Sequence, residues 1–165
     1  MSRKIRTVVG CVGSIVIADQ LTKYVVDRVM SLNKPEPIID GLFSLTYIRN
    51  PGAAFGIFAW LPPAFRLPFL ITVSLVAVGF ILMMLKRLRE TETGLITALA
   101  FILGGAIGNL IDRILYGEVI DFLDVYWSDY HWPAFNLADS FITIGVGITI
   151  YYLASAKGED PFAAK

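Results

Sequence analysis

Four long apolar stretches dominate the chain, and polar or aromatic connections separate them. Each stretch has roughly 20 residues, the length that crosses a bilayer as an α-helix. We therefore predict an α-helical integral membrane protein with four transmembrane helices. The predicted spans are residues 5–26, 64–85, 95–115 and 137–156.

The first apolar stretch follows basic residues, as the apolar part of a secretory signal peptide does. It is longer than the roughly 7–15 apolar residues of such a signal, it contains Asp19, and it lacks a convincing small-residue cleavage site. We expect it to be retained as a membrane span. A single membrane-embedded domain over residues 1–156 and a cytoplasmic tail over 157–165 are predicted.

Basic residues are concentrated on one side of the predicted spans. They precede the first span and fill the short connection after the second, whereas residues 116–135 contain no Lys or Arg and four acids. Because cytoplasmic loops of membrane proteins are enriched in Lys and Arg, we expect both termini in the cytoplasm. Residues 28–63 and 116–135 are then predicted to face outward.

The two outward connections differ in pattern. Residues 38–60 begin with β-branched and aromatic residues in partial alternation after a glycine turn, which predicts a small β-sheet. Residues 116–135 carry Tyr126, Trp127, Tyr130 and Trp132, and we interpret them as a segment at the membrane interface, where aromatic rings anchor.

Composition narrows the possible functions further. The 165 residues are 56% hydrophobic, more apolar than a soluble domain of this size requires. Basic and acidic side chains number 14 each, so no nucleic-acid partner is indicated. Cys11 and His131 are the single cysteine and histidine, which excludes an internal disulfide and argues against a zinc site.

Ionisable residues inside spans are functional candidates, because their burial must be compensated. Asp19 and Lys23 are four residues apart and share a helix face, either as an ion pair or as a substrate contact.

Gly104 and Gly108 form a GxxxG step that allows another helix to approach closely. Asn109, Asp112 and Arg113 follow on one side of that helix. They form either a polar packing collar or, as we favour, a site at the membrane surface.

Two aspartates flank the last connection. Asn136 is a candidate N-cap, which would put Asp139 in the first turn of the fourth helix, and Asp121 alone could be a solvated loop acid. Two carboxylates brought close together cannot both ionise easily, so one keeps a proton and the other can activate water, as in aspartic proteases. Asp124 and Asp129 are expected to be dispensable.

Five motifs then resemble a known family. The segments "DQLTK" (19–23), "RNPGAAFG" (49–56), "GGAIGNLIDR" (104–113), "VIDF" (119–122) and "FNLAD" (135–139) occur in the order seen in bacterial lipoprotein signal peptidase, also called signal peptidase II. The resemblance covers nearly the whole chain. It implies an intramembrane aspartic endopeptidase of the bacterial inner membrane, with the active site near the outer face. This enzyme cuts diacylglyceryl-modified prolipoproteins before the lipidated cysteine.

The resemblance also implies roles for individual residues. Asp121 and Asp139 correspond to the catalytic dyad. No metal or other cofactor is implied, and the expected partners are prolipoprotein substrates and membrane lipids, with the protein as a monomer. The remaining correspondences are to residues that line or support the site: Asn50, Gly52, Asn109, Arg113, Asn136, Asp19 and Lys23.

Two other classes of function remain as alternatives. A small proton-coupled transporter or channel would use membrane acids as a proton relay, but no internal repeat is visible and both acids lie on the outer side. A non-enzymatic assembly factor built on the glycine faces would tolerate asparagine at both acids.

Overall fold

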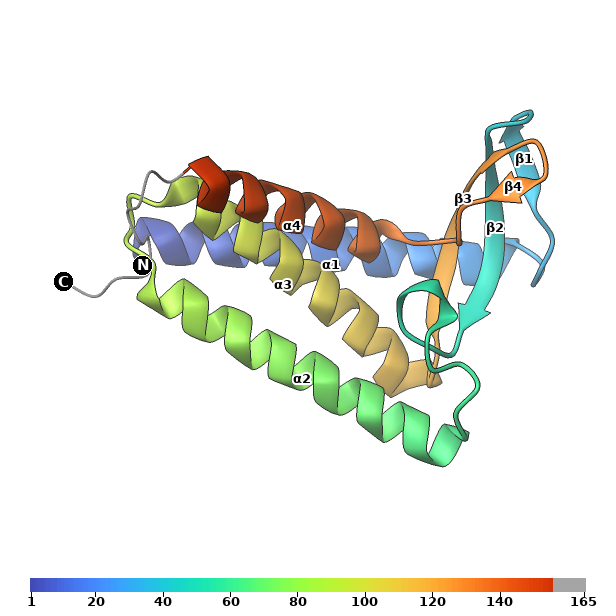
Figure 1. The fold of residues 1–165 in the computed structure, drawn as a ribbon, viewed down its shortest axis with the longest axis horizontal. Helices are drawn as coiled ribbons and strands as arrows, with labels where there is room; N and C mark the ends of the chain where they lie inside the picture. The colour runs from blue at the N-terminus through green and yellow to red at the C-terminus, as the bar shows by residue number, and fades with distance from the viewer. Residues whose placement is uncertain (156–165) are drawn as a thin grey trace.

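The computed structural model describes residues 1–155 and shows a bundle of four long helices with a small sheet at one end (Figure 1). All four helices are long and apolar enough to cross a membrane, which confirms the predicted fold class. The predicted tail and the last residue of the fourth predicted span lie outside the described residues. The helices are α1 (Arg3–Val29), α2 (Pro63–Arg87), α3 (Thr93–Tyr116) and α4 (Leu137–Ser155).

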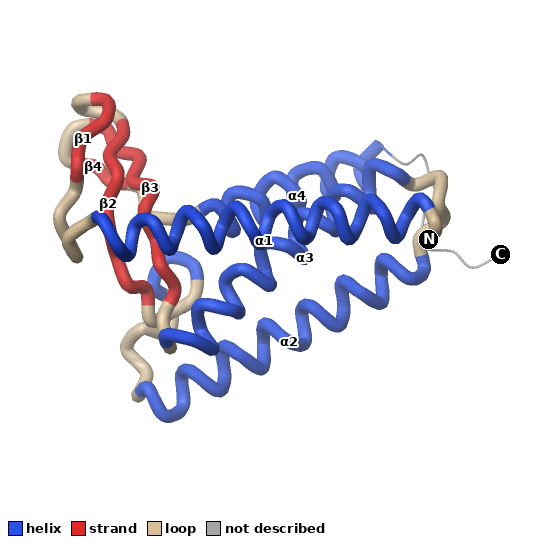
Figure 2. Tube along the Cα trace, turned by 180° about the vertical axis from the view of Figure 1, so that it is seen from behind, coloured by secondary structure: helices blue, strands red, loops and turns tan. Residues whose placement is uncertain are grey.

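Helix α3 is the centre of the bundle. Of the most apolar 18 residues of α3, 61% are buried inside the protein, whereas 11% are buried in the corresponding part of each of the other three helices. Helix α3 packs against all three of them, whereas α2 diverges from α1 towards the sheet (Figures 1 and 2). The largely apolar surfaces of α1, α2 and α4 are therefore available to lipid.

The GxxxG step of α3 faces α1, as its small residues predict. A Cβ atom on Gly108 would lie 2.5 Å from Oδ2 of Asp19, and one on Gly104 would lie 3.0 Å from Cβ of Ile15. Real Cβ atoms essentially never approach another atom to 2.5 Å, and a contact of 3.0 Å is tighter than nine in ten of those they make. Glycine at these two positions therefore brings the buried carboxylate of α1 directly against α3.

The sheet has four antiparallel strands in the order β1-β2-β3-β4. The strands are β1 (Glu36–Ile39), β2 (Phe43–Asn50), β3 (Val119–Trp127) and β4 (Tyr130–His131), with a 3-10 turn η1 (Ala54–Gly56) between β2 and α2.

The predicted sheet over residues 38–60 was wrong in extent. Strand β2 ends at Asn50, before Pro51, which has no N–H to donate to a ladder, and a turn follows. Half of the sheet comes instead from residues 119–131, which the sequence analysis had interpreted as an interfacial connection. The residues from Val119 to Phe122 are buried without alternation, so they lack the two-residue period that identifies a half-exposed strand.

A bulge in β2 decides which side chains share a face of the sheet. Leu45 pairs with Leu123, but Ile48 pairs with Asp121, so β2 has one extra residue between these pairs. Directly opposed residues point to the same face, and the extra residue therefore moves Asn50 onto the face of Asp121.

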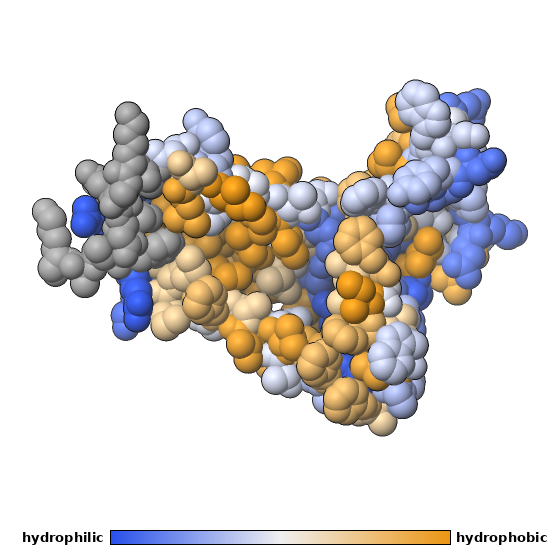
Figure 3. All heavy atoms as spheres, viewed as in Figure 1, coloured by the Kyte–Doolittle hydropathy of each residue, from blue (hydrophilic) through white to orange (hydrophobic). Residues whose placement is uncertain are grey.

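The helices and the sheet differ in the polarity of their surfaces. Hydrophobic residues cover the helices, and hydrophilic residues gather over the sheet (Figure 3). The N-terminus lies at the end of the bundle away from the sheet (Figure 1). We call these two regions the sheet end and the far end.

Candidate active site

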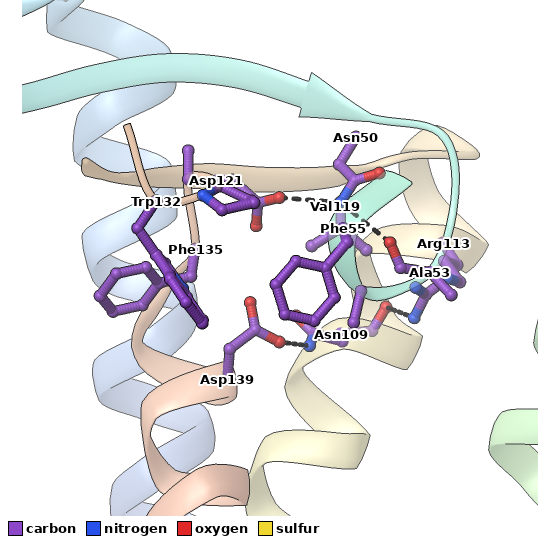
Figure 4. Close-up of a pocket in the computed structure, with 13 residues that line it drawn as sticks. Asn50, Ala53, Phe55, Asn109, Arg113, Val119, Asp121, Trp132, Phe135 and Asp139 are labelled. Carbon is purple, nitrogen blue, oxygen red and sulfur yellow. Dashed lines mark hydrogen bonds between the residues drawn. The ribbon is translucent and has the colours of Figure 1, made fainter. Parts of the chain in front are cut away.

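A cavity of about 90 Å³ lies between the sheet end of the bundle and the turn after β2. Asp121 of β3 and Asp139 of α4 both line it, and their carboxyl groups point into the same space (Figure 4). The cavity is large enough to hold water. The structure thus brings together the two acids that the sequence analysis had paired.

Asp121 is buried, and only 3% of its surface is exposed. Its two oxygens accept hydrogen bonds from Nδ2 of Asn50 at 3.0 Å and from Nδ2 of Asn136 at 2.8 Å. Burial, with a smaller effect from the negative charge of Asp139, raises the pKa of Asp121 to about 7. A carboxyl group with this pKa exchanges a proton near neutral pH.

Asp139 has the capping position that the sequence predicted. Its N–H donates to Oδ1 of Asn136 at 2.9 Å, and its Oδ2 accepts from the N–H of Asn136 at 3.3 Å. This reciprocal pair closes the first turn of α4. The other oxygen, Oδ1, accepts from Nδ2 of Asn109 at 2.7 Å, so the capping residue also belongs to the cavity.

Two asparagines connect the carboxyl groups. Nδ2 of Asn136 donates to Oδ1 of Asn109 at 3.1 Å as well as to Asp121, and Asn109 in turn donates to Asp139. The connection depends on the segment before α4, because Phe135 exchanges backbone hydrogen bonds with Leu123 of β3 at 2.8 and 3.0 Å. This pairing holds the start of α4 beside the strand that carries Asp121.

Arg113 fastens the turn after β2 over the cavity. Its Nη2 donates to the carbonyl oxygen of Gly52 at 3.1 Å, and the N–H of Gly52 donates to Oδ1 of Asn50 at 2.9 Å. Gly52 itself does not line the cavity, and a Cβ there would lie 2.5 Å from the carbonyl oxygen of Ile57. Gly52 therefore shapes the wall, while Asn50 and Arg113 reach the cavity.

Asp19 and Lys23 form an ion pair behind the cavity, at 2.9 Å, which is one of the two alternatives that their spacing had left open. The same ammonium contacts Oδ2 of Asp112 at 2.9 Å and donates to Oδ1 of Asn109 at 3.0 Å. Asp112 thus contacts α1, whereas Arg113, with which it was predicted to share a site, contacts Gly52. We call Asp19, Lys23 and Asp112 the ionic triad.

The ionic triad is tied to the elements that carry the cavity. Oδ1 of Asp19 accepts from the N–H of Ala138 in α4, and Oδ2 of Asp112 accepts from the N–H of Ile120 in β3. Nε2 of Gln20 donates to Asp112 at 2.9 Å. Neither Gln20 nor a role for Asp112 was predicted from the sequence. Two acids and one lysine in predicted membrane spans could have indicated that Asp112 also pairs with Lys23.

Two aromatic rings also line the cavity and were not predicted as site residues. Phe55 of η1 and Trp132 before α4 meet edge to face, with centroids 5.6 Å apart. Trp132 had been interpreted only as a membrane-interface residue. Phe55 lies in a three-residue 3-10 helix and Trp132 in an irregular segment, where no periodic pattern indicates the direction of a side chain.

Asp124 is buried, unlike the exposed Asp129 with which the sequence analysis grouped it. Its Oδ2 accepts from Oγ of Ser44 at 2.9 Å, and its carboxylate contacts Nδ1 of His131 at 3.0 Å. Asp124 therefore joins three strands of the sheet. It does not line the cavity.

Among residues 1–155 no group of three or more His, Cys, Asp or Glu side chains has the arrangement of a metal site. The polar groups that converge on the cavity are two carboxyls, two asparagine amides and one guanidinium. These groups can bind water, polarise a carbonyl and exchange a proton.

Comparison with known proteins gives a consistent result. The family model described as signal peptidase (SPase) II matches residues 11–155. The chain is 56% identical to a lipoprotein signal peptidase of Geobacter sulfurreducens over 136 residues, which are 82% of this chain and 83% of that protein. It is 43% identical to a lipoprotein signal peptidase of Nitratidesulfovibrio vulgaris over 161 residues, covering 98% and 96% of the two chains.

Solved structures agree with the sequence comparisons. A structure described as a bacterial membrane enzyme is 32% identical and superposes with a TM-score of 0.82, covering 98% of this chain and 96% of that one. A second one of the same description gives a TM-score of 0.83 at 31% identity, covering 93% and 96%.

Proposed function

The chain belongs to the signal peptidase II family of aspartic peptidases, and from this we propose that it uses Asp121 and Asp139 to cut diacylglyceryl-modified prolipoproteins before their lipidated cysteine. Membership of this family of hydrolases makes the transporter and the assembly factor unsupported alternatives. Removal of signal peptides from prolipoproteins is the activity of the family, and the dyad and the cleavage position are the finer proposal.

One observation carries the proposal. The two carboxyl groups, from β3 and α4, line one cavity and are connected through Asn109 and Asn136. With the pKa of Asp121 raised to about 7, a large fraction of the molecules carries a proton on this carboxyl group at neutral pH. One carboxylate and one carboxylic acid are then available together.

Hydrolysis can be written with these two groups alone. The carboxylate takes a proton from water as the water oxygen forms a bond to the scissile carbonyl carbon, and the carboxylic acid gives its proton to the carbonyl oxygen. The tetrahedral intermediate then collapses: its C–N bond breaks, the nitrogen receives the proton that the first carboxyl had taken, and one hydroxyl proton returns to the second carboxylate, which restores the starting pair. The products are the signal peptide with a new carboxyl end and a lipidated cysteine with a free amine.

We infer supporting roles from the contacts around the pair. Asn50, Asn109 and Asn136 orient the carboxyl oxygens, and Arg113 holds the turn that carries Gly52. Asp19 and Lys23 act from behind, because the ammonium of Lys23 fixes the amide oxygen of Asn109. These residues position the dyad and do not react themselves.

The proposed orientation puts the sheet end outside and both termini in the cytoplasm. The bases at the start of α1 and at the end of α2 support it, because cytoplasmic ends of spans are rich in Lys and Arg. A diacylated cysteine keeps its acyl chains in the outer leaflet, so its peptide carbonyl lies near the depth of helix ends such as that of α4. Water can reach a cavity at this depth from the outer side.

The test uses the purified protein and two synthetic precursors that differ only in the diacylglyceryl group. We expect cleavage of the lipid-modified precursor before its cysteine and no cleavage of the unmodified one, with products identified by mass spectrometry. Equal cleavage of both precursors would show that the lipid is not recognised. Cleavage at another bond would refute the proposed position.

A further inference from the structure

A second concave surface lies at the far end of the bundle, between the start of α1 and the end of α2. It is a groove of about 290 Å³. The two helix ends lie side by side near the N-terminus before the helices diverge (Figures 1 and 2). Its lining includes Lys4, Val8 and Val9 of α1 and Leu82, Leu85 and Lys86 of α2.

The floor of the groove is aliphatic and open to the outside of the protein. Val9 and Leu82 are 58% and 49% exposed, whereas Leu85 below them belongs to the buried core. In a membrane-spanning bundle such exposed aliphatic residues contact hydrocarbon. A groove between two helices holds one acyl chain on two sides, which a smooth helix surface cannot do.

Two ammonium groups stand at one end of this floor. Nζ of Lys4 donates to the carbonyl oxygens of Leu88 at 2.7 Å and of Lys86 at 3.4 Å, at the end of α2. This contact fixes the position of the Lys4 charge and offsets the negative end of the α2 dipole. An ammonium has three N–H donors, so Lys4 retains capacity for a further acceptor. Lys86 lines the same groove from the last turn of α2.

We propose that this groove binds an anionic phospholipid, with an acyl chain on the aliphatic floor and the phosphate between Lys4 and Lys86. Basic pockets between transmembrane helices are suited to anionic head groups, and charge complementarity selects them over zwitterionic ones. The site lies at the opposite end of the bundle from the dyad and is independent of the peptidase proposal. A bound lipid would add a second link between the adjoining ends of α1 and α2, beside the contact of Lys4 with the end of α2.

Native mass spectrometry of the purified full chain, titrated with phosphatidylglycerol or phosphatidylcholine of identical acyl chains, tests the proposal. We expect one tightly bound phosphatidylglycerol, retained more strongly than phosphatidylcholine. Lys86→Ala should weaken it about fivefold, the effect of one cation near an anionic head group. Arg87→Ala removes an equal charge from the same helix turn outside the groove and should change binding less than twofold.

Val9→Trp provides an independent variant, because it fills the groove and keeps every charge. We expect it to abolish tight phosphatidylglycerol binding while the thermal unfolding midpoint stays near that of the wild type. Unchanged lipid binding in Val9→Trp would overturn the proposal, and so would equal losses in Lys86→Ala and Arg87→Ala, which indicate diffuse surface charge. A dimer that Val9→Trp dissociates would make a second copy of the chain the occupant and would also overturn it.

Cleavage of the lipid-modified precursor, measured on the same preparations in detergent, separates this proposal from the function. Lys86→Ala should cleave at the wild-type rate under these conditions. Wild-type protein that cleaves the precursor but shows no preference for phosphatidylglycerol would refute the lipid site alone, and wild-type protein that binds phosphatidylglycerol but does not cleave would refute the peptidase proposal alone.

Discussion

Two pairs of aspartates lie close together in this molecule, and their surroundings differ. Asp19 and Asp112 share the ammonium of Lys23 at 2.9 Å each, and both are completely buried. Within residues 1–155 neither Asp121 nor Asp139 forms an ion pair, and asparagine amides hold them instead. The charge of Asp19 and Asp112 is compensated by Lys23. Asp121 and Asp139 are held in position by neutral groups, which do not compensate a charge.

The partner of a buried carboxyl group decides whether that group can exchange a proton during a reaction. The ammonium of Lys23 compensates both carboxylates, and each of them also accepts a backbone hydrogen bond, so the ionic triad is suited to joining α1, α3, β3 and α4. A carboxylate held by neutral amides can exist with or without its proton in nearly the same position. Amides therefore preorganise the second pair without removing its ability to exchange a proton.

The largest effect should follow from removing the proton exchange itself. Asp121→Asn and Asp139→Asn should each lower the turnover of a lipid-modified precursor by about 10²–10⁴-fold, the contribution of a general acid or base. Thermal unfolding should change far less than turnover, because asparagine has nearly the same shape and its amide oxygen keeps one of the two hydrogen bonds that each carboxyl group accepts. Near-normal turnover in Asp139→Asn would leave this residue as a helix cap only.

The ionic triad should respond in the opposite way. Lys23→Met leaves Asp19 and Asp112 buried without their cation and should lower the free energy of unfolding by about 3–5 kcal/mol. Lys34→Met removes an equal charge from an exposed position near the sheet and should have almost no effect. Thermal unfolding in detergent measures both. A triad variant as stable as the control would mean that the buried charges need no compensation.

The pH dependence of stability provides a further contrast. The pKa of Asp121 is raised from 3.8 to about 7, so its contribution to stability is fully present below about pH 4 and is lost as the pH rises to about 7. We expect Asp121→Asn to flatten the stability curve in this window, measured as the unfolding midpoint against pH. A variant curve parallel to that of the wild type would place the titrating group elsewhere.

The smallest effect in the comparison concerns acids outside both pairs. Asp124→Asn should keep cleavage activity, as the sequence analysis predicted. Asp124→Ala should lower the free energy of unfolding by about 1–3 kcal/mol, because Ser44 loses a buried hydrogen-bond partner. Asp129→Asn, at an exposed turn, is the matched control with no expected change in either measurement. A loss of activity in Asp124→Asn would mean that Asp124, and not Asp121, is the catalytic partner of Asp139.

Features that depend on neighbours in the chain were predictable. The four apolar stretches needed only their length, and the structure has helices at all four. The cap at Asn136 and the pair of Asp19 with Lys23 follow from spacings of three and four residues, and both are present. The GxxxG step of α3 likewise faces another helix, as small residues four positions apart on one helix face allow.

Features that depend on pairing between distant strands were not predictable. The residues around Asp121 were predicted to be a connection, but they form a buried strand. Both faces of this strand are covered, so its sequence lacks the alternation of polar and apolar residues. The polar residues predicted to form one site on α3 are divided between two places, with Asn109 and Arg113 at the cavity and Asp112 in the ionic triad. Asp112 turns to Lys23 and Arg113 to Gly52, because different elements pack against neighbouring positions of the helix.

By itself, the sequence determined the four membrane-spanning helices, the cap that starts α4 and the pairing of Lys23 with an acid, since helical periodicity and local hydrogen bonds act over a few residues. Only the tertiary structure decided that Asn50 contacts Asp121, through one extra residue in β2 that reverses the face of every side chain after it. The same holds for the distance of Asp121 from α4, which the backbone pairing of Phe135 with Leu123 sets. Alternative strand registers have nearly equal local energies, and the packing of the whole molecule selects one of them.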